Sequence, residues 1–143
     1  MVFLDESGAT TQMTRNYGRA PRGQRVNEAT PQGRWQILTM LAALTTRPRL
    51  RPGQVVIMDN LSVHKVAGVR ERIEAVGARL LYLPPYSPDF HPIEQAWSKV
   101  KQILRSLKAR TADALEAAVA EALAAITTEN AIAWFSHCGY SLH

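Results

Sequence analysis

The chain has 143 residues, with 17 lysines and arginines against 12 acidic residues and a formal net charge of +5. This length predicts one domain, residues 1–143, and the apolar content of 46% excludes wholesale disorder. The single cysteine excludes an intrachain disulfide framework, and it fits a reducing compartment such as the cytoplasm. The apolar stretch at residues 37–44 is too short to span a bilayer, and the first residues, MVFLDESG, do not form a signal peptide.

The first half of the chain predicts two strands separated by a loop. Residues 1–4 are an apolar run that predicts a buried strand ending at Asp5. Residues 15–33 are rich in glycine, proline and arginine, which predicts a long loop. Residues 35–44 are apolar on both alternating faces, as expected of a central strand.

The next segment predicts a βαβ unit. Residues 55–58 and 79–83 predict buried strands, and residues 64–76 predict an amphipathic helix between them that ends before Gly77. Such a unit implies parallel strands joined by a right-handed crossover. The fold class expected from these elements is α/β.

Helices are predicted for the rest of the chain. A proline-stiffened loop leads into a helix that starts at Pro92. Thr111 is expected to cap a further helix, and a short helix is predicted at residues 129–137. The apolar stripe of the first of these helices consists of Ile93, Trp97, Val100, Leu104 and Leu107.

Basic residues concentrate in two tracts. Residues 7–58 contain eight arginines and one acid, and residues 95–112 contain five basic residues and no acid. Such tracts predict a polyanionic partner, with a solvated basic surface as the alternative. The candidate DNA contacts are Arg15, Arg19 and Arg22 in the first tract and Lys101, Arg105 and Lys108 in the second. The latter three are expected on one helical face with Ser98 and Glu94, where they would position a DNA backbone without reading its sequence.

Three acids stand out by their positions. Asp5 and Asp59 each follow a predicted strand, and Glu94 falls in the first turn of a predicted helix. Sites form beyond the carboxyl ends of strands in α/β sheets, so the two aspartates are expected side by side, with Glu94 closing a cage of oxygens. Three carboxylates suit Mg²⁺ or Mn²⁺, and such a cage can hold two ions roughly 4 Å apart. For each acid alone, a turn, cap or helix-dipole role is the alternative.

The segments FLDESG, VIMDNLSVHK and LPPYSPDFHPIEQAWSKVK carry a family resemblance. In them the chain resembles the catalytic domain of DDE transposases from insertion sequences of the mariner-like superfamily. Asp5, Asp59 and Glu94 match the three catalytic acids of that family, with 34 residues between the last two. The resemblance implies a ribonuclease-H-like mixed sheet with flanking helices, two Mg²⁺ or Mn²⁺ ions, and metal-dependent hydrolysis and strand transfer at transposon DNA ends.

The chain departs from the family pattern in two places. Family members carry an extra strand and helix where this chain has residues 45–53, so we expect one strand and one helix fewer. The lost cover over apolar surface would favour a homodimer. The family usually has asparagine where this chain has His91; asparagine is the better N-cap, so His91 is expected to shift Glu94 slightly. The helix-turn-helix domain that precedes the catalytic domain in the family is not expected in this chain.

The predicted site has supporting residues and competing interpretations. Asn60, His64 and His91 are candidates for the surroundings of the metal ions, although His64 could equally cap its helix.

Whether the chain is an active enzyme stays open, because the second hypothesis is an inactive transposase remnant that binds nucleic acid non-specifically. A receiver-like phosphoacceptor domain is disfavoured, because residues 9–54 lack its alternating βα pattern. A DNA partner would place the protein in the cytoplasm, at the nucleoid.

Overall fold

Four strands form a mixed sheet in the order β2-β1-β3-β4 in the computed structural model, which describes residues 1–45, 49–65 and 67–141. The strands are β1 (Val2–Thr10), β2 (Ile37–Thr45), β3 (Val55–Met58) and β4 (Arg79–Tyr82). β3 runs parallel to both β1 and β4, with Val56 opposite Val2 on one side and Leu80 on the other. The predicted parallel βαβ unit and the expected α/β class are therefore confirmed.

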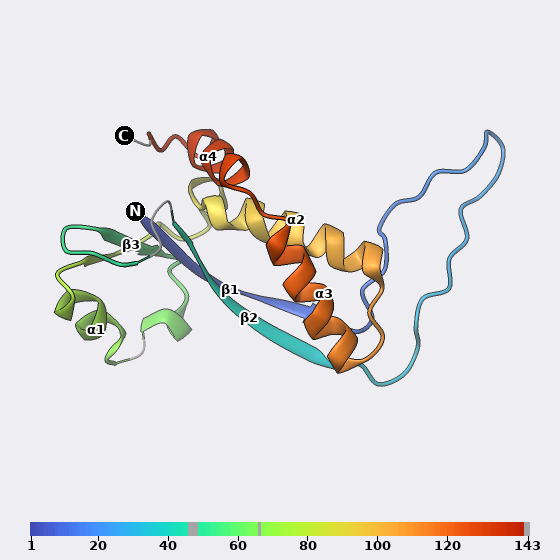
Figure 1. Cartoon of the computed structure of the whole chain (residues 1–143), viewed down its shortest axis with the longest axis horizontal. Helices are drawn as coiled ribbons and strands as arrows, with labels where there is room; N and C mark the ends of the chain where they lie inside the picture. The colour runs from blue at the N-terminus through green and yellow to red at the C-terminus, as the bar shows by residue number, and fades with distance from the viewer. Residues whose placement is uncertain (46–48, 66, 142–143) are drawn as a thin grey trace. The chain divides into compact units, whose positions relative to one another are not determined.

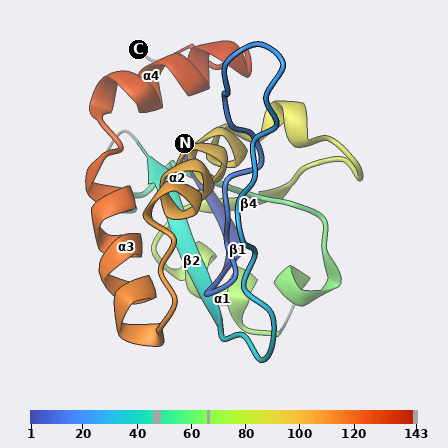
Figure 2. The same cartoon turned by 90° about the vertical axis from the view of Figure 1, so that its right-hand side faces the viewer.

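β2 runs antiparallel to β1, as the hydrogen bonds at the two ends of the pair indicate. The Thr11 amide donates to the Gln36 carbonyl at 3.2 Å, where β1 ends and β2 begins. The Thr45 hydroxyl donates to the Met1 carbonyl at 3.4 Å, at the opposite end of both strands. The two strands lie side by side in Figure 1 and Figure 2.

Two helical segments lie between β3 and β4 in chain order, and the other helical segments of the described chain follow β4 (Figure 1). They are the 3₁₀ turns η1 (Ser62–Lys65) and η2 (Pro88–Phe90) and the helices α1 (Val69–Ala75), α2 (Pro92–Leu107), α3 (Ala112–Ala124) and α4 (Thr128–His137). Thr111 caps α3 as predicted, with its hydroxyl accepting from the Ala114 amide at 3.2 Å. No helix of the described chain is long and apolar enough to cross a membrane.

Contacts divide the chain into two compact units. The first consists of Met1–Glu6, Leu41–Trp97 and Ile126–His143, and the second of Ser7–Met40 and Ser98–Ala125. In the first unit, Val2, Val56, Met58 and Leu80 form a core cluster, against which Val69 and Ile73 of α1 pack. Phe3 points to the opposite face of β1, because side chains alternate along a strand, and its ring lies 5.3 Å from that of Phe135 in α4.

The second unit contains the long loop that the composition predicted at residues 15–33. The loop has no helix or strand and is drawn as a long excursion in Figure 1. A Cβ added to Gly18 would come within 2.6 Å of a methyl group of Val26, so a larger residue at position 18 would force Val26 or the loop to shift. The Arg110 guanidinium donates to the Thr11 carbonyl at 3.0 Å and anchors the start of the loop.

Two predicted boundaries were wrong. β1 continues to Thr10 instead of ending at residue 4, so Asp5 lies inside the strand, because pairing with the nine-residue β2 extends it. The helix predicted at residues 64–76 is divided into η1 and α1, because Gly68 adopts a left-handed conformation with φ 90°. Residue 66 of that prediction lies outside the described residues.

β2 is an edge strand of the sheet, and the prediction of a central strand was wrong. Ile37 and Leu41, on one face of β2, are 66% and 68% exposed. Apolar residues occur on both faces of this strand, yet only one face is covered within the described chain. The sequence predicted one strand and one helix fewer than in the family, and the absence of such elements would leave apolar surface uncovered, as is observed on β2. Part of the segment that was expected to replace those elements, residues 46–48, lies outside the described residues.

Candidate metal centre

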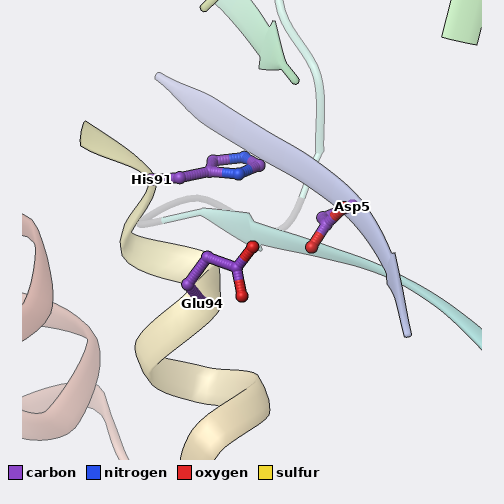
Figure 3. A group of neighbouring side chains, drawn as sticks. All are labelled: Asp5, His91 and Glu94. Carbon is purple, nitrogen blue, oxygen red and sulfur yellow. The ribbon is translucent and has the colours of Figure 1, made fainter. Parts of the chain in front are cut away.

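Three side chains of the first unit converge on one point (Figure 3). Asp5 comes from β1, His91 immediately precedes α2, and Glu94 is the third residue of α2. Each offers a ligand atom, and these atoms all lie within 4.8 Å of one another. Asp5 and His91 are 6% and 2% exposed, whereas Glu94 is exposed. The group therefore combines two carboxylates with one imidazole.

The start of α2 places His91 and Glu94 on the same side of the chain. The Glu94 amide donates to the His91 carbonyl at 3.0 Å, which puts His91 at the N-cap position expected from the sequence. Pro92 follows at the first helical position, where its fixed φ suits a helix and its missing N–H leaves no donor unpaired. The His91 amide donates to the Pro88 carbonyl at 2.9 Å and so connects α2 to η2.

Asp5 is a buried carboxylate held by a tryptophan. The Trp97 indole N–H donates to Asp5 Oδ2 at 2.9 Å, across 92 positions of sequence. No lysine or arginine of the described residues forms an ion pair with Asp5. Burying an ionised carboxylate without a cation is costly, so this environment is stabilised when a cation binds beside Asp5. The donor set therefore fits a divalent metal ion.

We expect Trp97→Phe to lower the free energy of unfolding by about 1–3 kcal/mol, because Asp5 Oδ2 would stay buried without its donor. Urea denaturation measures the change. Trp134→Phe is the matched control, since the Trp134 indole nitrogen has no hydrogen-bond partner in the described chain. Equal losses in the two variants, or an equal Trp97→Phe loss when Asp5 is already replaced by alanine, which has no acceptor for the indole N–H, would contradict this role for Trp97.

The His91 ring is buried with an unpaired nitrogen. Nε2 has no hydrogen-bond partner among the residues described. Burial lowers the pKa of His91 below its usual value, and the Asp5 and Asp59 carboxylates oppose this effect only in part. The imidazole is therefore neutral near pH 7, which is the form that coordinates metals.

Asp59 lies beside this group but is not one of its three members. It follows β3, and its Oδ1 accepts from the Leu61 amide at 3.1 Å and contacts Nδ1 of the buried His64. Asp59 and Asn60 line a cavity of about 310 Å³ together with His91 and Glu94. The structure thus brings two of the three predicted acids into one group, with the third on the wall of an adjoining cavity.

Two of these relationships were not predicted from the sequence. His91 was expected only in the surroundings of the metal ions, and Trp97 only in the apolar stripe of α2. The signal was their spacing, because His91, Glu94 and Trp97 follow one another at intervals of three residues and so lie near one side of a helix.

The predicted DNA contacts are spread over the second unit. Arg15 and Arg105 line one cavity of about 370 Å³, together with Tyr17. Lys101 is half-buried on α2, and Arg19 and Arg22 are exposed on the long loop.

The placement of Lys108 on the helical face was wrong. α2 ends at Leu107, and Lys108 adopts a left-handed conformation with φ 54°. Its amide donates to the Leu104 carbonyl at 3.0 Å, which closes the helix end. The Lys108 ammonium forms an ion pair with Glu28 of the loop.

Comparisons with known proteins find one matching family. Residues 1–54 and 45–116 match the model of a family described as DDE superfamily endonuclease. The two matches meet where the sequence predicted a missing strand and helix. No curated protein sequence matches the chain significantly.

Two solved structures share the fold. The crystal structure of the Mos1 strand transfer complex has a TM-score of 0.60 and 16% identity, covering 96% of this chain and 50% of that chain. The Mos1 transposase paired-end complex with left transposon end has a TM-score of 0.66 and 14% identity, covering 96% and 51%. The chain therefore spans about half the length of these proteins, and its sheet is ribonuclease-H-like.

Proposed function

The chain belongs to the DDE superfamily endonucleases, and from this premise we propose that it hydrolyses phosphodiester bonds at transposon DNA ends and joins the freed ends to target DNA. The observation that carries the proposal is the convergence of Asp5 and Glu94, with Asp59 on the wall of the adjoining cavity. Family membership implies dependence on a divalent metal, and the carboxylate-rich donor set suits Mg²⁺ or Mn²⁺.

In this proposal Asp5, Asp59 and Glu94 hold two metal ions. Such ions would supply Lewis-acid chemistry for a scissile phosphate and for an attacking hydroxyl group. Trp97 orients the Asp5 carboxylate through its indole N–H, and the contact with His64 restrains Asp59. The cavity beside Glu94 gives the phosphate access to these carboxylates.

The basic residues are proposed to position the DNA. Arg15 and Arg105 would contact phosphates at the cavity they share, with Arg19, Arg22, Lys101 and Lys108 as further contacts. The similar solved structures are a strand transfer complex and a paired-end complex with a transposon end, which supports DNA as the partner. The exposed apolar side chains of β2 support a homodimer, and a DNA substrate would place the protein at the nucleoid.

A second candidate function is that of an inactive remnant that binds DNA without cleaving it. The observation in its favour is the exposed apolar face of β2, at the edge where the family has a further strand. A remnant would bind DNA in a salt-sensitive manner and show no metal-dependent turnover.

Removing the metal distinguishes the two functions. We expect the purified chain to nick duplex DNA carrying transposon ends in Mn²⁺ or Mg²⁺, and EDTA to abolish nicking while salt-sensitive DNA binding continues. Asp59→Asn should lower nicking by about 100-fold or more, because it removes one metal-binding charge. Binding without nicking in either metal would favour the inactive remnant, and equal nicking by Asp59→Asn would remove Asp59 from the site.

A further inference from the structure

The candidate metal centre contains a nitrogen donor in addition to its carboxylates. His91 is 2% exposed, and its ring lies in the same group as the carboxylates of Asp5 and Glu94 (Figure 3). A buried polar atom without a partner is rare in folded proteins and calls for an explanation. Its Nε2 has no hydrogen-bond partner in the described part of the chain.

The spacing of the three donors suits one shared ion. When each bond to the ion is about 2.1 Å, two ligand atoms on it lie at most roughly 4.2 Å apart. The three donors here lie within 4.8 Å of one another, so small side-chain rotations would bring them to bonding distance. Of the three donor residues, Asp5 and His91 are buried and Glu94 is exposed.

The His91 ring is also held in place before any metal binds. Its backbone is tied on both sides, by the amide to the Pro88 carbonyl at 2.9 Å and by the carbonyl to the Glu94 amide at 3.0 Å. The ring packs against Phe3, with 5.6 Å between the ring centroids. Phe3 therefore packs against the imidazole ring, and a ring nitrogen of His91 lies within 4.8 Å of a carboxylate oxygen of Asp5 and of Glu94.

We infer that His91 is a direct metal ligand, together with Asp5 and Glu94, and that the centre therefore prefers Mn²⁺ to Mg²⁺. Magnesium takes oxygen ligands, whereas imidazole nitrogen suits transition metals. This inference rests on the proposed function only in assigning Asp5 and Glu94 to the metal. It concerns metal binding in the absence of DNA. The inference can therefore fail while the proposed DNA cleavage is correct, and the proposed cleavage can fail while the inference is correct.

The test measures metal affinity of the whole chain without DNA. Calorimetric titration with Mn²⁺ and with Mg²⁺ gives the two affinities and hence their ratio. The electron paramagnetic resonance signal of free Mn²⁺, which decreases when the ion binds, measures the Mn²⁺ affinity independently. We expect His91→Asn to lower Mn²⁺ affinity by roughly 10-fold or more and to change Mg²⁺ affinity much less, so that the ratio falls. Asparagine is a strong N-cap, so this variant should keep the start of α2 folded.

His137→Asn is the matched control, because His137 is an exposed histidine of α4 outside the donor group. It should leave the ratio unchanged. His91→Ala with added imidazole supplies a second reading, since free imidazole restores Mn²⁺ affinity only if the lost group was a ligand. An unchanged Mn²⁺ to Mg²⁺ ratio in His91→Asn, or no rescue of a folded His91→Ala by imidazole, would overturn the inference.

Discussion

Asp5→Asn is expected to lower metal-dependent DNA nicking by at least about 100-fold, because it removes the buried charge that neutralises the metal. The substitution preserves shape, and the asparagine carbonyl can still accept from the Trp97 indole N–H. A buried carboxylate without a neighbouring cation destabilises the metal-free fold, so the melting temperature of the metal-free variant should stay constant or rise. Loss of nicking with an unchanged or higher melting temperature is therefore the expected signature.

Glu6→Gln is the matched control for this variant. Glu6 is the next residue of β1 and is exposed, so its substitution removes the same charge from the same strand outside the site. We expect its nicking rate to stay close to that of the unmodified chain. A similar loss in both variants would indicate a general charge effect, and full activity in Asp5→Asn would contradict the proposed metal centre.

Phe3→Ala is expected to cost about 3–5 kcal/mol of unfolding free energy, the range for a fully buried aromatic residue. Phe3 is 0% exposed, and its ring centroid lies 5.3 Å from that of Phe135 and 4.9 Å from that of Tyr140. The same ring supports His91, so metal affinity should fall together with stability. Chemical denaturation and Mn²⁺ titration measure the two effects.

Phe90→Ala provides the comparison, because Phe90 is 53% exposed and its hydrogen bonds are made by its backbone. Its amide donates to the Ser87 carbonyl at 3.3 Å, and its carbonyl accepts from the Tyr140 hydroxyl at 2.7 Å. This substitution should cost less than about 1 kcal/mol, as surface changes usually do. If Phe3→Ala cost as little unfolding free energy as Phe90→Ala, the packing of Phe3 against Phe135 and Tyr140 would not support the site as proposed.

Local patterns predicted those elements whose limits are set by nearby residues. The strand at Val55–Met58 was predicted to the residue, since it is a continuous apolar run ending at Asp59. The start of α2 at Pro92 and the cap of α3 at Thr111 were also predicted, because both depend on residues within one helical turn. β1 was predicted too short, because its length depends on pairing with β2, a partner more than two dozen positions away.

The sequence by itself determined the chemistry available to this protein. The acids Asp5, Asp59 and Glu94, their order and their spacing are properties of short segments, and they predicted the family and its metal dependence. Only the tertiary structure decided which side chains meet. The group of Asp5, His91 and Glu94 and the bond from Trp97 to Asp5 join β1 to the start of α2 across most of the chain. Such contacts form when distant elements pack on one sheet, and no pattern within a short window of sequence records that packing.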